Sequence, residues 1–138
     1  MNLCPCGARG DPGAECSCSP QRLAAFRDKL SRALLDRFDL VITVPRPRAL
    51  ELAAAAGESS QDVRSRVVAA RGRSPASRTP AADELLSHAV DRLPLSARGR
   101  ARVARVARSI AALAGADAVE EEHLAEALSY RSPRELDR

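Results

Sequence analysis

Four cysteines near the amino terminus are the residues of this chain most suited to chemistry. Cys4 and Cys6 form one C-x-C pair, and Cys16 and Cys18 form a second pair after residues 7–15. In a reducing compartment such a set more often binds a metal than forms disulfides. Zinc accepts four thiolates in a tetrahedron, so the pattern predicts a structural Zn²⁺ site. Because four thiolates fill every coordination position, a catalytic zinc is not expected.

The spacing of these cysteines leaves alternatives open. Familiar zinc knuckles place two to four residues between paired ligands, whereas C-x-C places one. Gly7, Gly10 and Gly13 would let the loop between the pairs fold back on itself. The alternatives to a metal site are four free thiols in a loop, or cysteines kept from a family pattern without metal.

The arginines are the second set of candidates. Lys and Arg number 22 against 18 Asp and Glu, which gives a formal net charge of +4. Lys29 is the only lysine, and abundant Arg together with abundant Ala fits a GC-rich coding bias as well as it fits phosphate binding. The net charge is therefore weak evidence for a nucleic-acid partner.

One predicted helix nevertheless carries a basic face. Arg98, Arg102 and Arg105 share one side of it, with Arg108 flanking them. These side chains could bind phosphates of a nucleotide or of DNA, or could pair with the acidic run 120–122. The chain has only three aromatic residues, which argues against stacking on single-stranded bases. His123, just inside a helix start, is expected to pack or cap and not to bind a metal.

Length and composition bound the size of the unit. The 138 residues predict one domain or a piece of one. Much of the 45% hydrophobic content is Ala, which buries little area, so the core is expected to be thin. No stretch approaches the roughly 20 apolar residues that span a bilayer, and residues 1–13 show no secretory h-region. We therefore expect a cytoplasmic protein with no membrane partner.

The elements that must position these residues follow from local patterns. Ser19 and Pro20 open a helical pattern that continues through Leu34, and residues 38–44 form an apolar, β-branched run that predicts one buried strand. A short Ala-rich helix is predicted over 48–56, and a second helix starts at Ser59 or Ser60. A lone buried strand needs partners, so the chain resembles part of a larger sheet.

The second half is predicted to be helical. Residues 71–82 are rich in Arg, Ser and Pro and indicate a flexible linker. Three helices are expected after it, over about 81–93, 96–114 and 120–130, with Gly115 ending the second. Short connections favour a compact three-helix unit.

Ordered motifs along the chain resemble a known family. They are Asn2-Leu-Cys-Pro-Cys-Gly7, Cys16-Ser-Cys18, Leu34-Leu-Asp-Arg37-Phe-Asp-Leu40, Leu95-Ser-Ala-Arg98, Arg105-Val-Ala-Arg108-Ser-Ile110 and Glu122-His-Leu-Ala-Glu-Ala-Leu128. Together they are similar to the magnesium-chelatase-like AAA+ ATPases of ComM/YifB type. The resemblance covers nearly the whole chain, but only the C-terminal portion of a family member, because neither Walker A nor Walker B is present.

The resemblance implies a fold and a set of site residues. The fold would be mainly α: residues 1–47 the end of an AAA+ core with one strand and the Cys-rich loop, 48–82 a helical connection and linker, and 83–138 a three-helix C-terminal lid domain. Asn2 matches the sensor-1 residue and Arg37 matches the arginine finger that reaches a neighbour's nucleotide. The alternative for Arg37 is an ion pair with Asp36 or Asp39 at the junction of helix and strand. Arg98 matches the sensor-2 contact to the nucleotide's phosphates.

The function implied is that of a ring-forming, homo-oligomeric motor that uses ATP and Mg²⁺ and acts on DNA. By itself the chain is expected not to hydrolyse ATP, because it lacks the Lys and the acid that hold the phosphates and Mg²⁺. It would need a separate chain carrying the ATPase core. The alternative is a small zinc-knuckle and helical module that binds nucleic acid.

Overall fold

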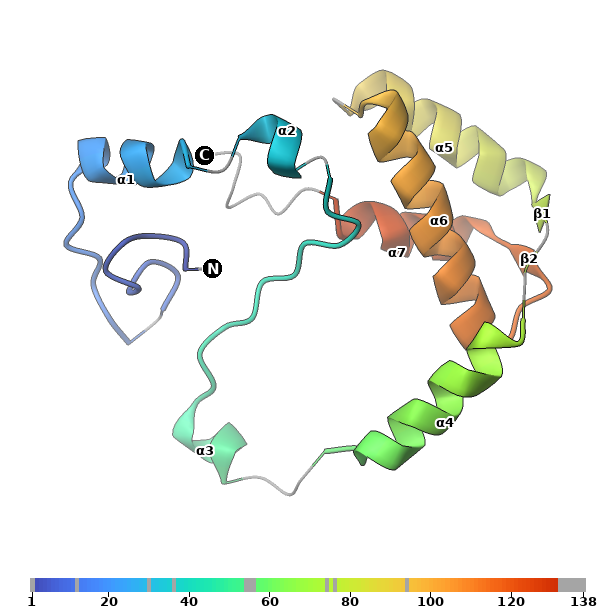
Figure 1. The fold of residues 1–138 in the computed structure, drawn as a ribbon, viewed down its shortest axis with the longest axis horizontal. Helices are drawn as coiled ribbons and strands as arrows, with labels where there is room; N and C mark the ends of the chain where they lie inside the picture. Colours follow the sequence, from blue (N-terminus) through green and yellow to red (C-terminus); the bar gives the residue numbers. More distant parts are fainter. Residues whose placement is uncertain are drawn as a thin grey trace.

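The computed structural model describes most of the chain. The described residues are 2–11, 13–29, 31–35, 37–53, 57–73, 75, 77–93 and 95–131. They are mainly helical, with a single pair of short strands among them. Figure 1 shows the helices of the C-terminal half gathered on one side and the N-terminal loop and first helix on the other. The mainly α prediction is confirmed.

The C-terminal half forms the packed part of the molecule. It consists of α5 (Pro80–Arg92), α6 (Ala97–Ala114) and α7 (Glu121–Ser129), close to the predicted bounds. Side chains from all three helices form one apolar cluster, in which Leu86, Val103 and Leu124 are fully buried. The other buried members are Val106, Ala107, Ala111, Val119 and Ala127. Small Ala side chains let the helices approach closely, so the core is thin but continuous.

The ends of these helices are defined by local chemistry. The Thr79 and Ser96 hydroxyls accept the backbone N–H groups of Ala82 and Gly99, which caps α5 and α6. Gly115 ends α6 in the left-handed conformation with φ of 78°. His123 is buried, and its Nδ1 accepts the backbone N–H of Glu120 at 3.0 Å, which confirms the capping role expected for it.

The predicted linker is structured at its C-terminal end. Strand β1 (Ser77–Arg78) pairs in parallel with β2 (Ala118–Val119), and α5 begins at Pro80. Pro75 and Ala82 are buried. Residues 77–82 therefore belong to the packed helical unit. Local composition could not show this, because the strand partner lies about forty residues later in the chain.

The first helical pattern is interrupted. Instead of one helix through Leu34, the structure has α1 (Pro20–Arg27) and α2 (Arg32–Leu35), and Leu30 lies outside the described residues. Helix α1 buries no residue, so no packing energy holds the helix together through Asp28 and Lys29. The Ser31 hydroxyl accepts the Leu34 N–H and starts the second helix.

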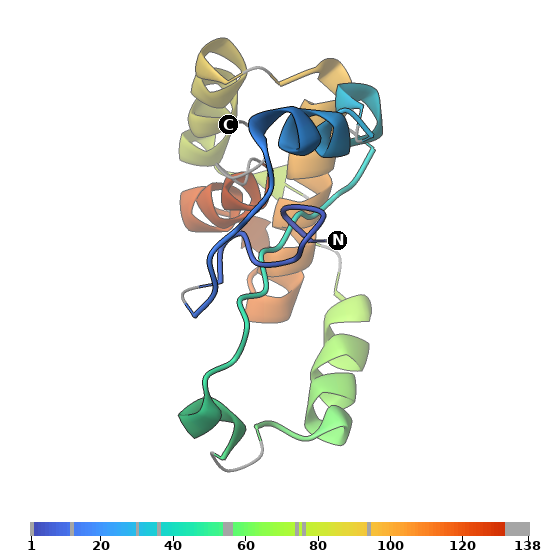
Figure 2. The same cartoon turned by 90° about the vertical axis from the view of Figure 1, so that its left-hand side faces the viewer.

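The strand predicted over 38–44 is wrong. These residues run as an extended segment without ladder pairing, and Leu40, Ile42 and Val44 are exposed. A strand needs a neighbouring strand that pairs with it along its length, and in the described part of the chain the strand pairing joins only β1 and β2. Figure 2 shows this segment descending from α2 toward α3 (Ala49–Leu52).

Helix α4 (Ser60–Arg71) links the extended half to the packed half. The Ser59 hydroxyl accepts the Asp62 N–H, so the predicted start is confirmed. The helix contacts α6 but buries no residue, and its Val63 and Val68 are exposed. Helix α3 is shorter than the predicted 48–56, and residues 54–56 lie outside the described part. No described helix is long and apolar enough to span a bilayer.

Candidate metal centre and nucleotide-contacting arginines

The structure brings the four cysteine sulfurs together. The Sγ atoms of Cys4, Cys6, Cys16 and Cys18 all lie within 4.8 Å of one another, and the Cys4 and Cys6 sulfurs are 3.3 Å apart. All four are free thiols. A tetrahedral zinc with Zn–S bonds of about 2.3 Å would need sulfurs about 3.8 Å apart. The cluster is thus near the size of a Zn²⁺ tetrahedron, and its donor set fits that metal.

The backbone of the loop supports this cluster. The Gly7 N–H donates to the Cys4 carbonyl at 3.2 Å, and the Arg9 N–H donates to the Cys4 Sγ at 3.3 Å. Gly7 has a φ of 82° and Gly10 a φ of 84°, conformations that favour glycine. A Cβ on Gly10 would come within 2.9 Å of the Leu3 side chain. The two glycines therefore allow the tight turns that a C-x-C bite requires.

The thiols differ in acidity. Hydrogen bonds from the Ala8 backbone and from the Cys4 and Cys18 side chains lower the pKa of Cys6 to about 6. The backbone N–H of Cys18 favours the Cys16 thiolate, but partial burial and the neighbouring sulfurs outweigh it and raise the pKa of Cys16 to about 11. The lowered pKa favours the thiolate form of Cys6 at neutral pH, with the Cys4 sulfur within hydrogen-bond distance of it. A bound metal cation would remove this difference in acidity, because it favours the thiolate form of every cysteine that binds it.

An ion pair joins the Cys loop to the extended segment. The Asp11 carboxylate accepts the Gly13 N–H at 2.9 Å and pairs with the Arg46 guanidinium at 3.2 Å. These contacts hold the pKa of Asp11 below its usual range. Sequence reasoning did not single out this pair, because the partners lie 35 positions apart in the chain.

The three family-matched residues do not meet. Asn2 is exposed and its side chain lies beside Gly7. Arg37 is exposed in the turn after α2, where its Nη1 donates to the Ala33 carbonyl at 2.7 Å. Arg98 is exposed in the first turn of α6. Within the described part of the chain, no hydrogen bond or ion pair joins any two of them.

Asp39 connects the segment after Arg37 to α6. Its Oδ1 accepts from the Arg102 guanidinium at 2.7 Å, and Arg105 lies 3.8 Å away. The predicted pairing of these arginines with residues 120–122 is therefore replaced by pairing with Asp39. The alternative in which Asp39 pairs with Arg37 does not hold either, and Asp36 lies outside the described residues.

Two further contacts hold the same segment against α7. The Val41 N–H donates to the Tyr130 carbonyl at 3.0 Å, and Arg131 donates to the Phe38 carbonyl at 2.6 Å. Residues 38–41, which follow Arg37 directly, therefore lie against the helical unit. The sequence shows only that Asp39 and Arg102 carry opposite charges. Many other pairs in the chain do so too, and opposite charge alone does not reveal a partner so far along the chain.

Family models match both halves of the chain. Residues 1–53 match the model for magnesium chelatase, subunit ChlI, and residues 73–131 match the model for its C-terminal part. The two matches follow each other in order and include every candidate site residue. The chain belongs to the magnesium chelatase-like family of ComM/YifB type.

Relatives of this magnesium chelatase-like chain are found in several bacteria. It is 38% identical to an uncharacterized protein of Mycobacterium tuberculosis over 152 residues, covering 94% of this chain and 30% of that protein. It is 35% identical to the uncharacterized protein YifB of Escherichia coli, covering 83% of this chain and 27% of that protein. It is likewise 35% identical to the competence protein ComM of Haemophilus influenzae, covering 83% and 26%.

The chain thus spans under a third of the length of these relatives. The mycobacterial alignment extends over 152 positions, more than the 138 residues of this chain, so that relative has insertions with respect to it. Residues 54–72, which include the whole of α4, lie outside both family matches. The two family matches therefore cover the Cys loop and the segment around Arg37, in residues 1–53, and the helical unit, in residues 73–131.

Proposed function

We propose that this chain supplies the arginine-finger and lid functions of a magnesium chelatase-like AAA+ ATPase that uses ATP and Mg²⁺, assembles as a ring and acts on DNA. Family membership over 1–53 and 73–131 is the observation that carries this proposal. Arg37 acts in trans on a neighbour's nucleotide, Arg98 contacts its phosphates, and Asn2 orients the attacking water.

The exposure of Arg37 supports its role. A guanidinium that serves a neighbouring subunit must reach out of its own subunit, and Arg37 is exposed beside a segment fixed to α6. Such a group neutralises charge that develops on the transferring phosphoryl group and is worth about 10³–10⁵ in rate. Arg98, exposed at the start of α6, is placed on an element that could approach phosphates.

The chain alone does not hold the nucleotide. Its sequence has no G-x-x-x-x-G-K-[ST] loop to cradle phosphates and no Walker B acid for Mg²⁺. These groups would come from another polypeptide or from another part of a longer protein. We therefore expect the isolated chain to show no ATPase activity.

A reconstitution experiment tests this proposal. The chain is mixed with a separate magnesium chelatase-like chain that carries Walker A and B but ends before the arginine-finger motif, and ATP hydrolysis is measured. The expected result is stimulation that R37A lowers by about 10³-fold, since the finger acts on the chemical step. The matched control R22A changes another exposed arginine, on α1, and should leave the stimulation unchanged.

Two results would contradict the proposal. ATP hydrolysis by the isolated chain would show that the phosphate-holding groups are present after all. Equal stimulation by wild type and R37A would show that Arg37 does not act on the nucleotide.

The four sulfurs favour a second candidate, a zinc-stabilised module that binds nucleic acid. The proximity of all four Sγ atoms supports it. Metal analysis of the purified chain tests it, with about one zinc per chain expected and loss of that zinc in C4S. S17A, between two of the ligands, is the matched control. A chain free of zinc after expression with added zinc would exclude this candidate.

A further inference from the structure

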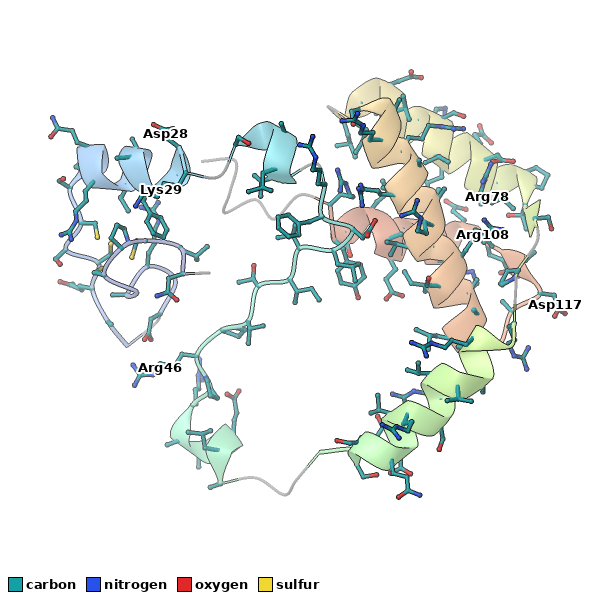
Figure 3. All side chains as sticks on the ribbon, viewed as in Figure 1. Asp28, Lys29, Arg46, Arg78, Arg108 and Asp117 are labelled. Carbon is teal, nitrogen blue, oxygen red and sulfur yellow. The ribbon has the colours of Figure 1, made fainter. Side chains whose placement is uncertain are left out.

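A pocket of about 320 Å³ lies between β1, β2 and α6. Its rim carries three guanidinium groups, from Arg78 on β1 and from Arg105 and Arg108 on α6. Its remaining lining is small or apolar and includes Ala101, Ala104 and Val119. Figure 3 shows Arg78 and Arg108 near each other where α6 faces the strands. Asn2, Arg37 and Arg98 do not line this pocket.

The charges at this pocket are only partly neutralised. Arg78 pairs with Asp83, and Arg105 lies at the outer limit of an ion pair with Asp39, at 3.8 Å. Arg108 donates from Nε to the Pro75 carbonyl at 3.4 Å, and no carboxylate in the described part of the chain pairs with it. Three guanidinium groups thus face two carboxylates, which leaves a net positive pocket suited to an anion.

The small residues explain why the pocket exists. Ala101 and Ala104 lie one helical turn before Arg105 and Arg108 on α6, and their short side chains line the pocket together with the buried Val119. Arg105 and Arg108 are three residues apart, a rise of about 4.5 Å on one face of the helix. The Nε contact of Arg108 leaves its two Nη groups available to a ligand.

We propose that this pocket binds a backbone phosphate of a DNA strand. This inference rests on the DNA part of the proposed function. A phosphodiester offers anionic oxygens that guanidinium groups bind in bidentate fashion. The lining contains no aromatic side chain to stack on a base and no Asn or Gln to recognise a base edge, so binding is independent of sequence. Arg108 carries the largest share because its charge is the least compensated.

Oligonucleotide binding tests the inference directly. The full chain is titrated into a fluorescein-labelled single-stranded 20-mer, and anisotropy is recorded at several salt concentrations. Each lost phosphate contact should reduce the slope of log K against log[salt] by about 0.7. For R108Q we therefore expect that reduction, with affinity about 5- to 10-fold weaker at 50 mM salt. R108K, which keeps the charge, should restore most of the slope.

Matched variants separate the pocket from general electrostatics. R100Q removes the same charge from an exposed position of α6 outside the pocket, and should leave the slope unchanged. Equal effects of R108Q and R100Q, or no effect of R108Q, would overturn the inference. Thermal melts of each variant show whether the fold is kept, and R78Q provides a second pocket variant should R108Q not fold.

Two further outcomes assign the source of the phosphate. Displacement of the 20-mer from the wild type by unlabelled DNA, but not by millimolar ATP, supports the DNA assignment. If ATP displaces the 20-mer more strongly than unlabelled DNA does, and this displacement depends on Arg108, the pocket binds a nucleotide and the DNA assignment is overturned. The binding assay does not depend on ATP hydrolysis, so the two proposals can fail separately. A chain that does not bind DNA would refute this inference even if the reconstituted mixture showed Arg37-dependent ATP hydrolysis. A chain that binds DNA through Arg108 would support this inference even if that hydrolysis were absent.

Discussion

The Cys6 thiol is more acidic than the Cys16 thiol. Its pKa of about 6 makes it a thiolate at neutral pH, whereas Cys16, with a pKa of about 11, keeps its proton. Thiolates, not thiols, are the nucleophiles in alkylation. The Cys loop without metal should therefore show one fast site and one slow site.

We expect iodoacetamide to modify Cys6 first when metal has been removed with EDTA. Because the folded pKa lies below the ordinary value, the fast rate should be present above pH 6 and fall as pH drops through about 6. Peptide mass spectrometry across pH 5–9 measures this profile. C6S should abolish the fast phase, and S17A, which keeps all four thiols, should retain it. Preferential labelling of Cys16 at pH 7 would contradict the assignment.

Asp39 is the residue whose removal should free the segment after Arg37. D39N removes the ion pair with Arg102. Because the pair is partly exposed, the loss in unfolding free energy should be below about 1 kcal/mol. The Val41 N–H, which donates to Tyr130, should nevertheless exchange faster with deuterium. Hydrogen exchange measured by mass spectrometry reports this, with D28N as the control on α1. Unchanged Val41 exchange in D39N would show that the ion pair does not hold the segment.

Helix α6 depends on the glycine that follows it. Gly115 has a φ of 78°, a conformation that costs a residue with a Cβ about 1–2 kcal/mol. G115A should lower the unfolding free energy by that amount in urea titration. Gly57 has no neighbouring atom within 4 Å of an added Cβ and no positive φ, so G57A is the control and should change stability little. Equal effects of the two substitutions would contradict a specific helix-ending role for Gly115.

The elements of the C-terminal half could be predicted well because their signals are local. Thr79, Ser96 and Gly115 mark helix ends through side-chain and backbone chemistry that needs no distant partner. The apolar spacing of α6 and α7 then selects the face that is buried. In the N-terminal half the same reasoning failed at residues 38–44, because an apolar β-branched run forms a strand only where a neighbouring strand pairs with it.

At the scale of the molecule, the most exposed large apolar side chains among the described residues lie within residues 42–52. Ile42 is 64% exposed, Val44 84% and Leu50 85%, whereas the core side chains of α5, α6 and α7 are buried. The backbone there has few partners, so it opens at low cost.

Limited trypsin digestion should therefore cut first after Arg48. Arginines on α6, such as Arg102, lie in a helix that packs on the core and should be cut later. Gel analysis and mass spectrometry of the first fragments measure this order. A chain that supplies an ATPase core should slow the cut after Arg48 if it covers this stretch. First cleavage within α6 would show that α6 is no better protected by packing than the stretch that contains Arg48.

Residue types and local spacing alone predicted the cluster of Cys4, Cys6, Cys16 and Cys18 and the three C-terminal helices. Both depend on interactions between close neighbours in the chain. The tertiary structure alone placed Asp39 against Arg102, joined β1 to β2, and set Arg78 beside Arg108 around one pocket. Those contacts join residues tens of positions apart. Many acids in the chain could pair with many arginines, and several short segments could pair as strands. The packing of the helices determines which of these pairs form.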